Sequence, residues 1–299
     1  MNINKEKGLI YITLSSFTSA TFGLFVKLAE PTLSIPFLIV MRFFIPLIIC
    51  IPLFWYAGTF VKIKTSKQLK NGLLRGFYMV TSQYCFFYYI SQSSLLNATM
   101  LYYTAPVFIP LISKYLLKDK SVKIFSKSIF LTLVGVGFIV QPDQSFLMSA
   151  SLIGLLSGIF WAISQSMIAE AVQDRHFDEG LFFSFSISSC LAILILVIFY
   201  FKKIPDGFAN LEKMSGLEWA FVFLMALFTS FSQYFRGLAY SHVKPYLLAP
   251  LLNLSVLFAF FYDLFVFKKT SDFLSIVGSL LIILGSILKW MSIRKTHKV

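Results

Sequence analysis

The sequence is poor in charged residues and in the side chains that usually carry enzymatic chemistry. Charged residues make up 13% of the 299 residues, about half the share of an ordinary soluble domain. The three histidines stand far apart, and no GxSxG, HExxH, P-loop or strand-following GxGxxG motif occurs. The three cysteines lie in apolar stretches without CxxC or Cys/His spacing. These absences argue against an enzyme, a metal site and a bound cofactor.

Hydrophobic residues dominate instead, at 58% of the chain with a mean hydropathy of +0.79. They form runs of about 20 residues, which is the length of a helix that crosses a hydrocarbon layer. Only helices satisfy their own backbone groups in lipid over such runs, so the sequence predicts an all-α membrane protein. The ten predicted transmembrane helices cover residues 8–29, 35–57, 70–92, 98–117, 122–141, 149–170, 180–201, 216–240, 245–266 and 272–291.

The second half of the chain repeats the first. Ser82-Gln83-Tyr84 recurs as Ser232-Gln233-Tyr234, and Gly135 meets Gly285 at the same offset. Because each half holds an odd number of spans, the two halves are expected to insert in opposite orientations, as in transporters built by duplication. We therefore predict two inverted five-helix repeats, over residues 1–143 and 144–299.

The net charge of +13 and the isoelectric point of 9.6 raise the question of a nucleic-acid partner. The basic residues lie mainly between apolar runs and form no single solvated face, so we expect membrane lipids and a small-molecule substrate as partners and no nucleic acid. In the first half the outer loops, near 30–34, 93–97 and 142–148, contain no Lys or Arg. The positive-inside rule then predicts a cell (inner) membrane protein with both termini cytoplasmic. The sequence does not decide whether the protein is a monomer or a homodimer.

Polar side chains inside the apolar spans are the candidate cargo contacts, because each must face protein or water rather than lipid. In span 216–240, Thr229, Gln233, Arg236 and Tyr240 fall on one helix face. Packing between helices is the alternative role for each Ser, Thr or Tyr. The predicted substrate-binding residues are Gln83, Tyr84, Tyr88, Tyr103, Trp161, Gln165, Gln233, Arg236, Tyr246 and Asn253.

Arg236 is the predicted anion contact, because a guanidinium forms a fork that fits a carboxylate or phosphate. It lies about one turn from the inner end of its span, so snorkelling to the membrane surface is the alternative. Other charged residues are assigned to ion pairs by depth alone. The predicted gating residues are Arg75 and Glu170 at the inner level, which is the right depth to join Arg236, with Lys27, Arg42 and Asp263 at the outer level.

Several short motifs resemble those of a known family. They are Leu74-Arg75-Gly76, Asn97-Ala98-Thr99 leading to Ala105-Pro106, Lys118-Asp119 and Gly135-Val136-Gly137. On these motifs the chain resembles the drug/metabolite transporter superfamily, in particular its ten-span EamA-type branch. The second copy departs from the pattern, since Val256 replaces the proline and Lys269 stands opposite Asp119. The resemblance implies a cargo pathway between the repeats, lined by spans one, three, four, six, eight and nine.

These features predict a secondary transporter that moves small polar organic metabolites by alternating access, with amino acids or their derivatives favoured. S-adenosylmethionine carriers look similar at the Arg-Gly pair of the third span and at Pro245-Tyr246, and nucleotide-type carriers and multidrug exporters are further alternatives. A membrane-embedded enzyme would need clustered catalytic groups, for which the acidic segment 174–179 is the one candidate. A scaffold or receptor would lack a polar pathway. Direction and ion coupling stay open.

Overall fold

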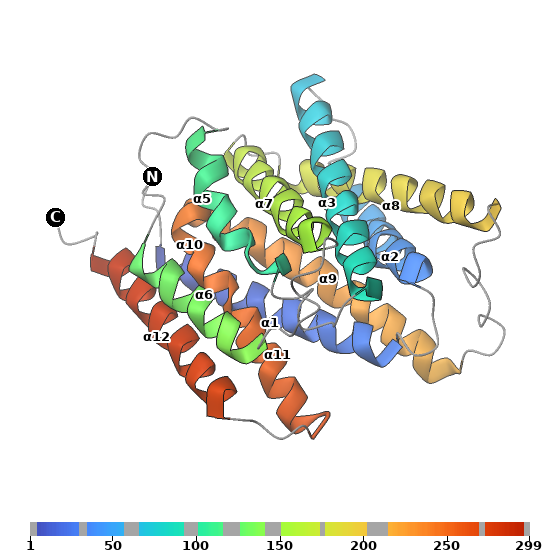
Figure 1. Cartoon of the computed structure of the whole chain (residues 1–299). Coiled ribbons are helices and arrows are strands. Elements are labelled where there is room, and N and C mark those ends of the chain that lie inside the picture. The colour runs from blue at the N-terminus through green and yellow to red at the C-terminus, as the bar shows by residue number, and fades with distance from the viewer. Residues whose placement is uncertain are drawn as a thin grey trace.

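The chain folds into a bundle of helices in the computed structural model (Figure 1). The structure describes residues 5–29, 35–56, 66–92, 101–115, 126–140, 151–173, 177–201, 215–268 and 273–295. Every regular element within these ranges is a helix, as predicted. The first half contributes α1 (Lys5–Ala29), α2 (Ile35–Tyr56), α3 (Ser66–Gln92), α5 (Ala105–Tyr115) and α6 (Lys127–Val140). The second contributes α7 (Ser151–Gln173), α8 (Phe177–Phe201), α9 (Gly216–His242), α10 (Pro245–Leu252), α11 (Leu254–Phe265) and α12 (Phe273–Lys295).

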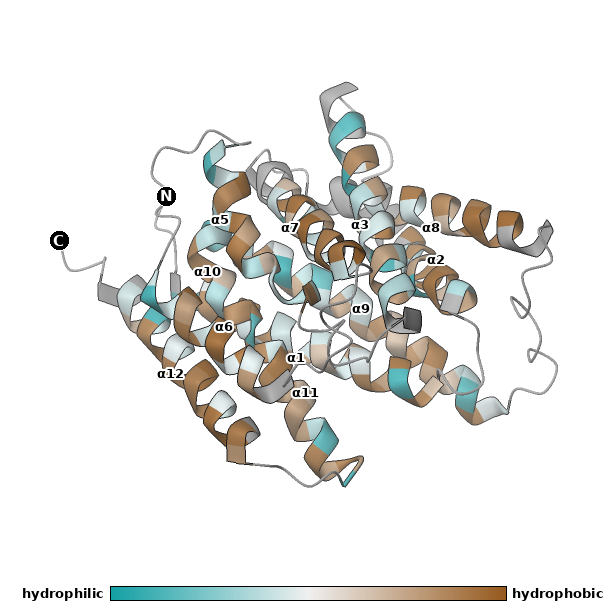
Figure 2. Cartoon of the chain, viewed as in Figure 1, coloured by the Kyte–Doolittle hydropathy of each residue, from teal (hydrophilic) through white to brown (hydrophobic). Residues whose placement is uncertain are grey.

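The outer faces of these helices are apolar, which suits contact with lipid. Among the described residues, four stretches are long and apolar enough to cross a membrane: Glu6–Ala29, Ser151–Ile168, Gly216–His242 and Pro245–Phe265. Shorter apolar helices cover Pro36–Ile49, Lys127–Phe138, Ser184–Ile198 and Ile276–Ser292. Figure 2 shows mostly brown helices, and large side chains such as Phe223, Leu280 and Phe265 are exposed on them. Such a surface is unfavourable in water and favourable in hydrocarbon.

Helices of the two halves pair reciprocally. α1 runs along α9, and α3 runs along α7. Ser15 Oγ donates a hydrogen bond to the Ser232 carbonyl at 2.8 Å, and Ser82 Oγ donates one to the Ser157 carbonyl at 2.8 Å. Ser82 and Ser232 are counterparts in the repeat, so the same position makes an interhelical hydrogen bond in each half, although Ser82 donates from its hydroxyl and Ser232 accepts at its carbonyl. A twofold relation between the halves would produce this reciprocity, while their inverted orientation in a membrane stays a prediction.

α6 and α12 meet at glycines that allow close approach of the two backbones, side by side in Figure 1. A Cβ atom added to Gly135 would lie 2.6 Å from the carbonyl oxygen of Gly278. A Cβ atom on Gly285 would lie 3.0 Å from the carbonyl oxygen of Ser128. Gly278 and Ser128 are also separated by the repeat offset, so the contact is again reciprocal. Neither glycine has room for a side chain.

The fourth and ninth predicted spans are interrupted, whereas the hydropathy of the sequence predicts each as one continuous helix. A turn at Tyr103 and Thr104 precedes α5, and a turn at Asn253 separates α10 from α11. Pro106 has no N–H group with which to continue the helix across the first turn. At the second turn the Asn253 N–H donates to the Pro250 carbonyl at 3.3 Å. This bond spans three residues rather than the four of an α-helix, so the turn is tighter. Broken helices at corresponding places in two repeats are where secondary transporters commonly bind their cargo.

Candidate functional site

Three arginines lie buried among the helices. Arg42 of α2, Arg75 of α3 and Arg236 of α9 are 8%, 2% and 2% exposed. Arg236 lies close enough to the other two for electrostatic repulsion between the guanidinium groups. Within the described residues none of the three forms an ion pair. Positive charge in a medium of low dielectric constant is costly unless an anion accompanies it.

Arg75 and Arg236 form one group with two glutamines. Arg75 Nη2 donates to Gln233 Oε1 at 3.4 Å, and Arg236 Nη1 donates to Gln165 Oε1 at 3.4 Å. Gln233 and Arg236 share a face of α9 because they are three residues apart. The guanidinium carbon of Arg236 lies 5.1 Å from the centre of the Trp161 ring, within the range of a cation–π contact. The amide oxygens are neutral, so they orient the guanidinium groups without cancelling their charge.

Arg42 forms a second group, which is linked to the first through the Tyr102 and Trp161 rings. Arg42 Nη1 donates a hydrogen bond to Gln83 Oε1, and Gln83 Nε2 donates to the Tyr102 hydroxyl at 3.3 Å. The guanidinium carbon of Arg42 lies 4.0 Å from the centre of the Phe22 ring. Gln83 thus has the same role for Arg42 that its repeat counterpart Gln233 has for Arg75. The two glutamines of the Ser-Gln-Tyr repeat both orient a buried arginine.

Several donors in these groups have no hydrogen-bond partner within the part of the chain that the structure describes. They are the Nε atoms of Arg42, Arg75 and Arg236, Nη1 of Arg75, Nε2 of Gln165 and the hydroxyl of Tyr240. Each buried donor without a partner costs about 1–3 kcal/mol. Positive charge and unused donors in one place are the complement of an anion rich in acceptor oxygens.

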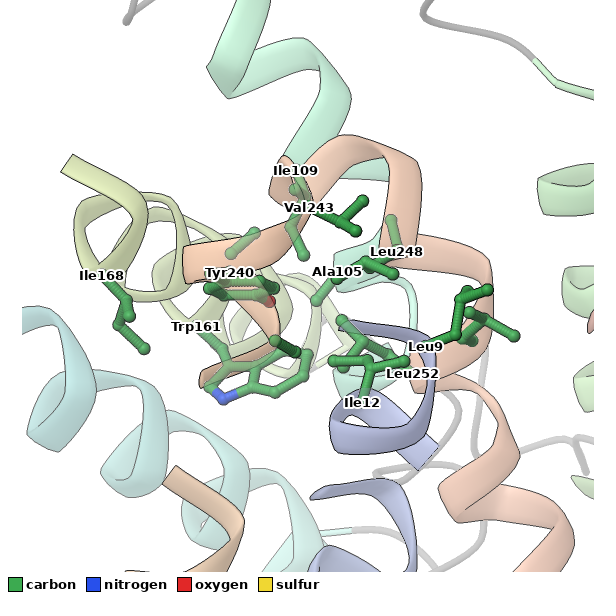
Figure 3. Close-up of a cluster of buried hydrophobic side chains, with 14 residues drawn as sticks. Leu9, Ile12, Ala105, Ile109, Trp161, Ile168, Tyr240, Val243, Leu248 and Leu252 are labelled. Atoms are coloured by element: carbon green, nitrogen blue, oxygen red, sulfur yellow. The ribbon is translucent and has the colours of Figure 1, made fainter. Parts of the chain in front are cut away.

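Aromatic rings connect the two groups. The Tyr102 and Trp161 ring centres are 5.0 Å apart, and Tyr103 packs edge-on against Tyr102 at 5.6 Å. Figure 3 shows Trp161 and Tyr240 within a buried apolar cluster, the other members of which come from α1, α5, α7, α9 and α10. The charged groups therefore lie against rings that can contact the apolar part of an organic molecule.

Six predicted substrate-binding residues lie in or beside this cluster of arginines, and a seventh is buried at a helix break. Gln83, Gln165, Gln233 and Arg236 make the hydrogen bonds above, Trp161 contacts Arg236, Tyr103 packs on Tyr102, and Asn253 is buried at the break between α10 and α11. Asn253 donates from Nδ2 to Thr132 Oγ1 at 3.0 Å, while its Oδ1 has no partner. Asn253 therefore ties the helix break to α6 rather than to an arginine.

Three predicted tyrosines point elsewhere. The Tyr84 hydroxyl donates to the Ala192 carbonyl of α8 at 3.3 Å, and Tyr88 is 51% exposed. Tyr246 is partly buried against the apolar cluster and lies 5.9 Å from Lys244 Nζ. The buried face of α3 passes through Arg75 and Gln83 rather than through the tyrosines. The hydroxyl of Tyr84 therefore serves to join α3 to α8.

The predicted gating residues separate into different environments. Lys27 Nζ lies 2.6 Å from Asp263 Oδ1 and 3.9 Å from the centre of the Phe267 ring, which joins α1 to α11. Arg42 does not join this pair, because its guanidinium contacts Gln83. Arg75 lies beside Arg236, and the side chain of Glu170 lies outside the described residues. A gating role for the Lys27–Asp263 pair stays a prediction.

Two contributors were missing from the predicted set of substrate-binding residues. The predicted set contains Tyr103 rather than Tyr102, because it assumes a continuous helix over 98–117, and the turn at Tyr103 changes which side chains face inward. Tyr240 lies on the predicted stripe of α9, of which all four members are buried. Its position on that stripe is the sequence feature that could have identified Tyr240 as a substrate-binding candidate.

Comparison with known proteins assigns the family. The sequence profile of the EamA-like transporter family matches the chain twice, over residues 6–141 and 148–291. The chain belongs to the EamA-like transporter family. It is an integral membrane protein of the drug/metabolite transporter type, and family and fold agree with the predicted all-α membrane architecture.

Individual relatives point to the same class. A pseudopaline exporter of Pseudomonas aeruginosa is 24% identical over 289 residues, covering 94% of this chain and 95% of that protein. Human solute carrier family 35 member G1 is 25% identical over 290 residues, covering 94% of this EamA-like chain and 78% of the carrier. One crystal structure superposes with a TM-score of 0.73 at 13% identity, covering 94% of this chain and 96% of that one. At that identity the superposition speaks for the fold alone.

Proposed function

We propose that this protein is a secondary transporter of small polar organic metabolites that carry an anionic group, with amino acids or their derivatives as the favoured cargo. The observation that carries the proposal is the set of three buried guanidinium groups without an ion-pair partner among the described residues. A cargo carboxylate or phosphate would supply the missing negative charge and accept from the unused donors.

Burial of the cluster supports transport by alternating access. Because the arginines and glutamines are almost fully buried, cargo reaches them only when helices of the two halves move apart. Helix breaks at Tyr103 and Asn253 sit at corresponding places in the two halves and supply points at which such movement can occur. We place the protein in the cell (inner) membrane with both termini cytoplasmic, on the charge distribution of its first half.

Among the alternatives, a nucleotide-type carrier gains support and two others lose it. The sequence located one arginine at the cargo site, whereas the structure brings Arg75 beside Arg236, and paired cations suit phosphates. S-adenosylmethionine and cationic drugs carry positive charge, which three buried arginines would repel. A phosphorylated metabolite is therefore the second candidate.

Counterflow in liposomes tests the proposal. The purified protein, reconstituted in vesicles preloaded with one unlabelled compound, is offered the labelled compound outside, from a panel of acidic, neutral and basic amino acids, nucleotides and polyamines. The proposal expects counterflow with anionic members of the panel and a loss of at least tenfold in Arg236→Gln. Counterflow restricted to polyamines or cationic drugs, or full activity in Arg236→Gln, contradicts it.

A further inference from the structure

The three arginines form two separate anion-binding groups on one helix framework. Gln83, which orients Arg42, and Arg75 are both carried by α3. They are eight residues apart, which is about 12 Å of helix rise. The first group is Arg42 with Gln83 and Tyr102. The second group is Arg75 and Arg236 with Gln165 and Gln233.

Both groups have unused donors. Among the described residues, Nε of Arg42 has no partner in the first group, and Nε and Nη1 of Arg75 and Nε of Arg236 have none in the second. Each guanidinium offers five N–H donors, and one neutral glutamine oxygen engages only part of that set. Hydrogen-bonding capacity for acceptor oxygens is therefore left at two places rather than one.

The charge of the three arginines also indicates two anionic groups in the ligand. A single monoanion bound at either group would leave two of the three guanidinium charges buried without compensation, and Arg236 repels both of the others. Acidic side chains that the structure describes are confined to Glu6, Glu218 and Asp263, and Asp263 already pairs with Lys27. None of these described acidic side chains pairs with an arginine of the cluster, and a bound anion would supply the compensating charge.

We propose that the cargo is a polyanion with at least two separate anionic groups, carboxylate or phosphate, one bound by the Arg42 group and one between Arg75 and Arg236. The middle of the cargo lies along the Tyr102 and Trp161 rings, the centres of which are 5.0 Å apart. This inference rests on the proposed transport function and narrows its substrate class from any anionic metabolite to a polyanionic one. A compact ion such as inorganic phosphate fills one group only.

Thermal unfolding of the full-length, detergent-solubilised protein measures binding independently of transport. The polyanionic probes are tricarballylate, glutarate and pyrophosphate, and the comparison compounds are propionate, glutamine and inorganic phosphate at matched ionic strength. We expect polyanions to raise the Tm at concentrations at least tenfold lower than the comparison compounds. If tricarballylate raises the Tm more than pyrophosphate does, the anionic groups of the cargo are carboxylates. The reverse order indicates phosphates.

Single substitutions in each group complete the test. Arg42→Gln and Arg75→Gln should each weaken polyanion binding at least tenfold and leave the weak binding of propionate within threefold. Arg42→Lys keeps the charge and loses the fork, so an intermediate effect is expected. Lys70→Gln removes an exposed positive charge from the same helix and is the matched control, with no change in binding.

Three results overturn the polyanion assignment. They are equal stabilisation by polyanions and comparison compounds, an Arg42→Gln variant that folds and binds tricarballylate and pyrophosphate normally, and counterflow with glutamine but not with any polyanion. The last result leaves the proposed transport function intact. Stabilisation by polyanions without counterflow of any compound supports the two-group site and contradicts transport, so the two failures are distinguishable.

Discussion

Replacing Arg75 by methionine separates a cargo contact from a structural cation, because the two roles predict opposite changes in stability. Arg75 has two donors without partners, Nε and Nη1, and one long hydrogen bond of 3.4 Å to Gln233. Removing two unsatisfied buried donors relieves about 2–6 kcal/mol, at about 1–3 kcal/mol for each. Losing the bond and leaving Gln233 Oε1 without a donor costs about 1–3 kcal/mol. At the mid-points of these two ranges the net expectation is a variant more stable by about 2 kcal/mol without cargo.

Transport should change in the other direction. A charge-assisted hydrogen bond contributes about 1.5–3 kcal/mol, which corresponds to cargo binding weaker by about 10- to 150-fold. The assays are thermal or denaturant unfolding of the solubilised protein without cargo, and counterflow in liposomes with the cargo found above. Lys70→Met on the exposed part of α3 is the control, with an expected stability change within about 0.5 kcal/mol.

A loss of stability in Arg75→Met would refute this reasoning. Removal of one member of a buried ion pair destabilises a protein by about 3–5 kcal/mol, because the partner is left charged and alone. That result would mean that Arg75 has a counter-charge in the cargo-free protein and that its unused donors are engaged there. A more stable variant with unchanged counterflow would also count against a cargo contact.

Three further substitutions test other parts of the structure. Gly135→Val should destabilise the α6–α12 contact by about 1–3 kcal/mol in unfolding measurements. Gly23→Ala is the control and should be neutral or stabilising, because a Cβ atom at Gly23 meets no atom within 4 Å. Equal effects of the two substitutions would contradict the close approach of α6 and α12. Lys27→Ala should reduce the free energy of unfolding by only about 0.2–1 kcal/mol, because the side chains of the Lys27–Asp263 pair are 27% and 28% exposed. A double-mutant cycle with Asp263→Ala measures this coupling. A gate is indicated when the change in exchange rate, expressed as a free energy, exceeds the change in stability. Asn253→Leu should leave the Tm unchanged or higher and reduce counterflow, because a leucine favours continuity between α10 and α11; undiminished counterflow would argue against the break as a moving part.

Much of the fold followed from the sequence because the bilayer imposes a simple rule. Runs of apolar residues near the required length must be helices, and the helices begin and end close to the predicted ranges, as with 216–240 and α9. Breaks at Tyr103 and Asn253 were not predicted, because both lie within apolar runs that satisfy the same rule. A run of apolar residues gives the length of a span and says little about its continuity.

The candidate site was predictable only in part. Gln233 and Arg236 were found because a single helix places them on one face, whatever surrounds it. Tyr84 and Tyr88 were chosen by the same periodicity, yet the buried face of α3 is the one through Arg75 and Gln83. Periodicity identifies residues that share a face, and the neighbouring helices decide which face is buried.

The sequence by itself determined that the chain is a helical membrane protein made of two related halves, because hydropathy and repeated motifs are properties of the chain read in order. Only the tertiary structure decided that Arg42, which the sequence assigns to the outer membrane level, joins Arg236 and Arg75 of the inner level. These three residues come from α2, α3 and α9, and helix periodicity carries no information on which helices become neighbours. Their meeting is a consequence of packing between the two halves, and the case for an anionic cargo depends on it.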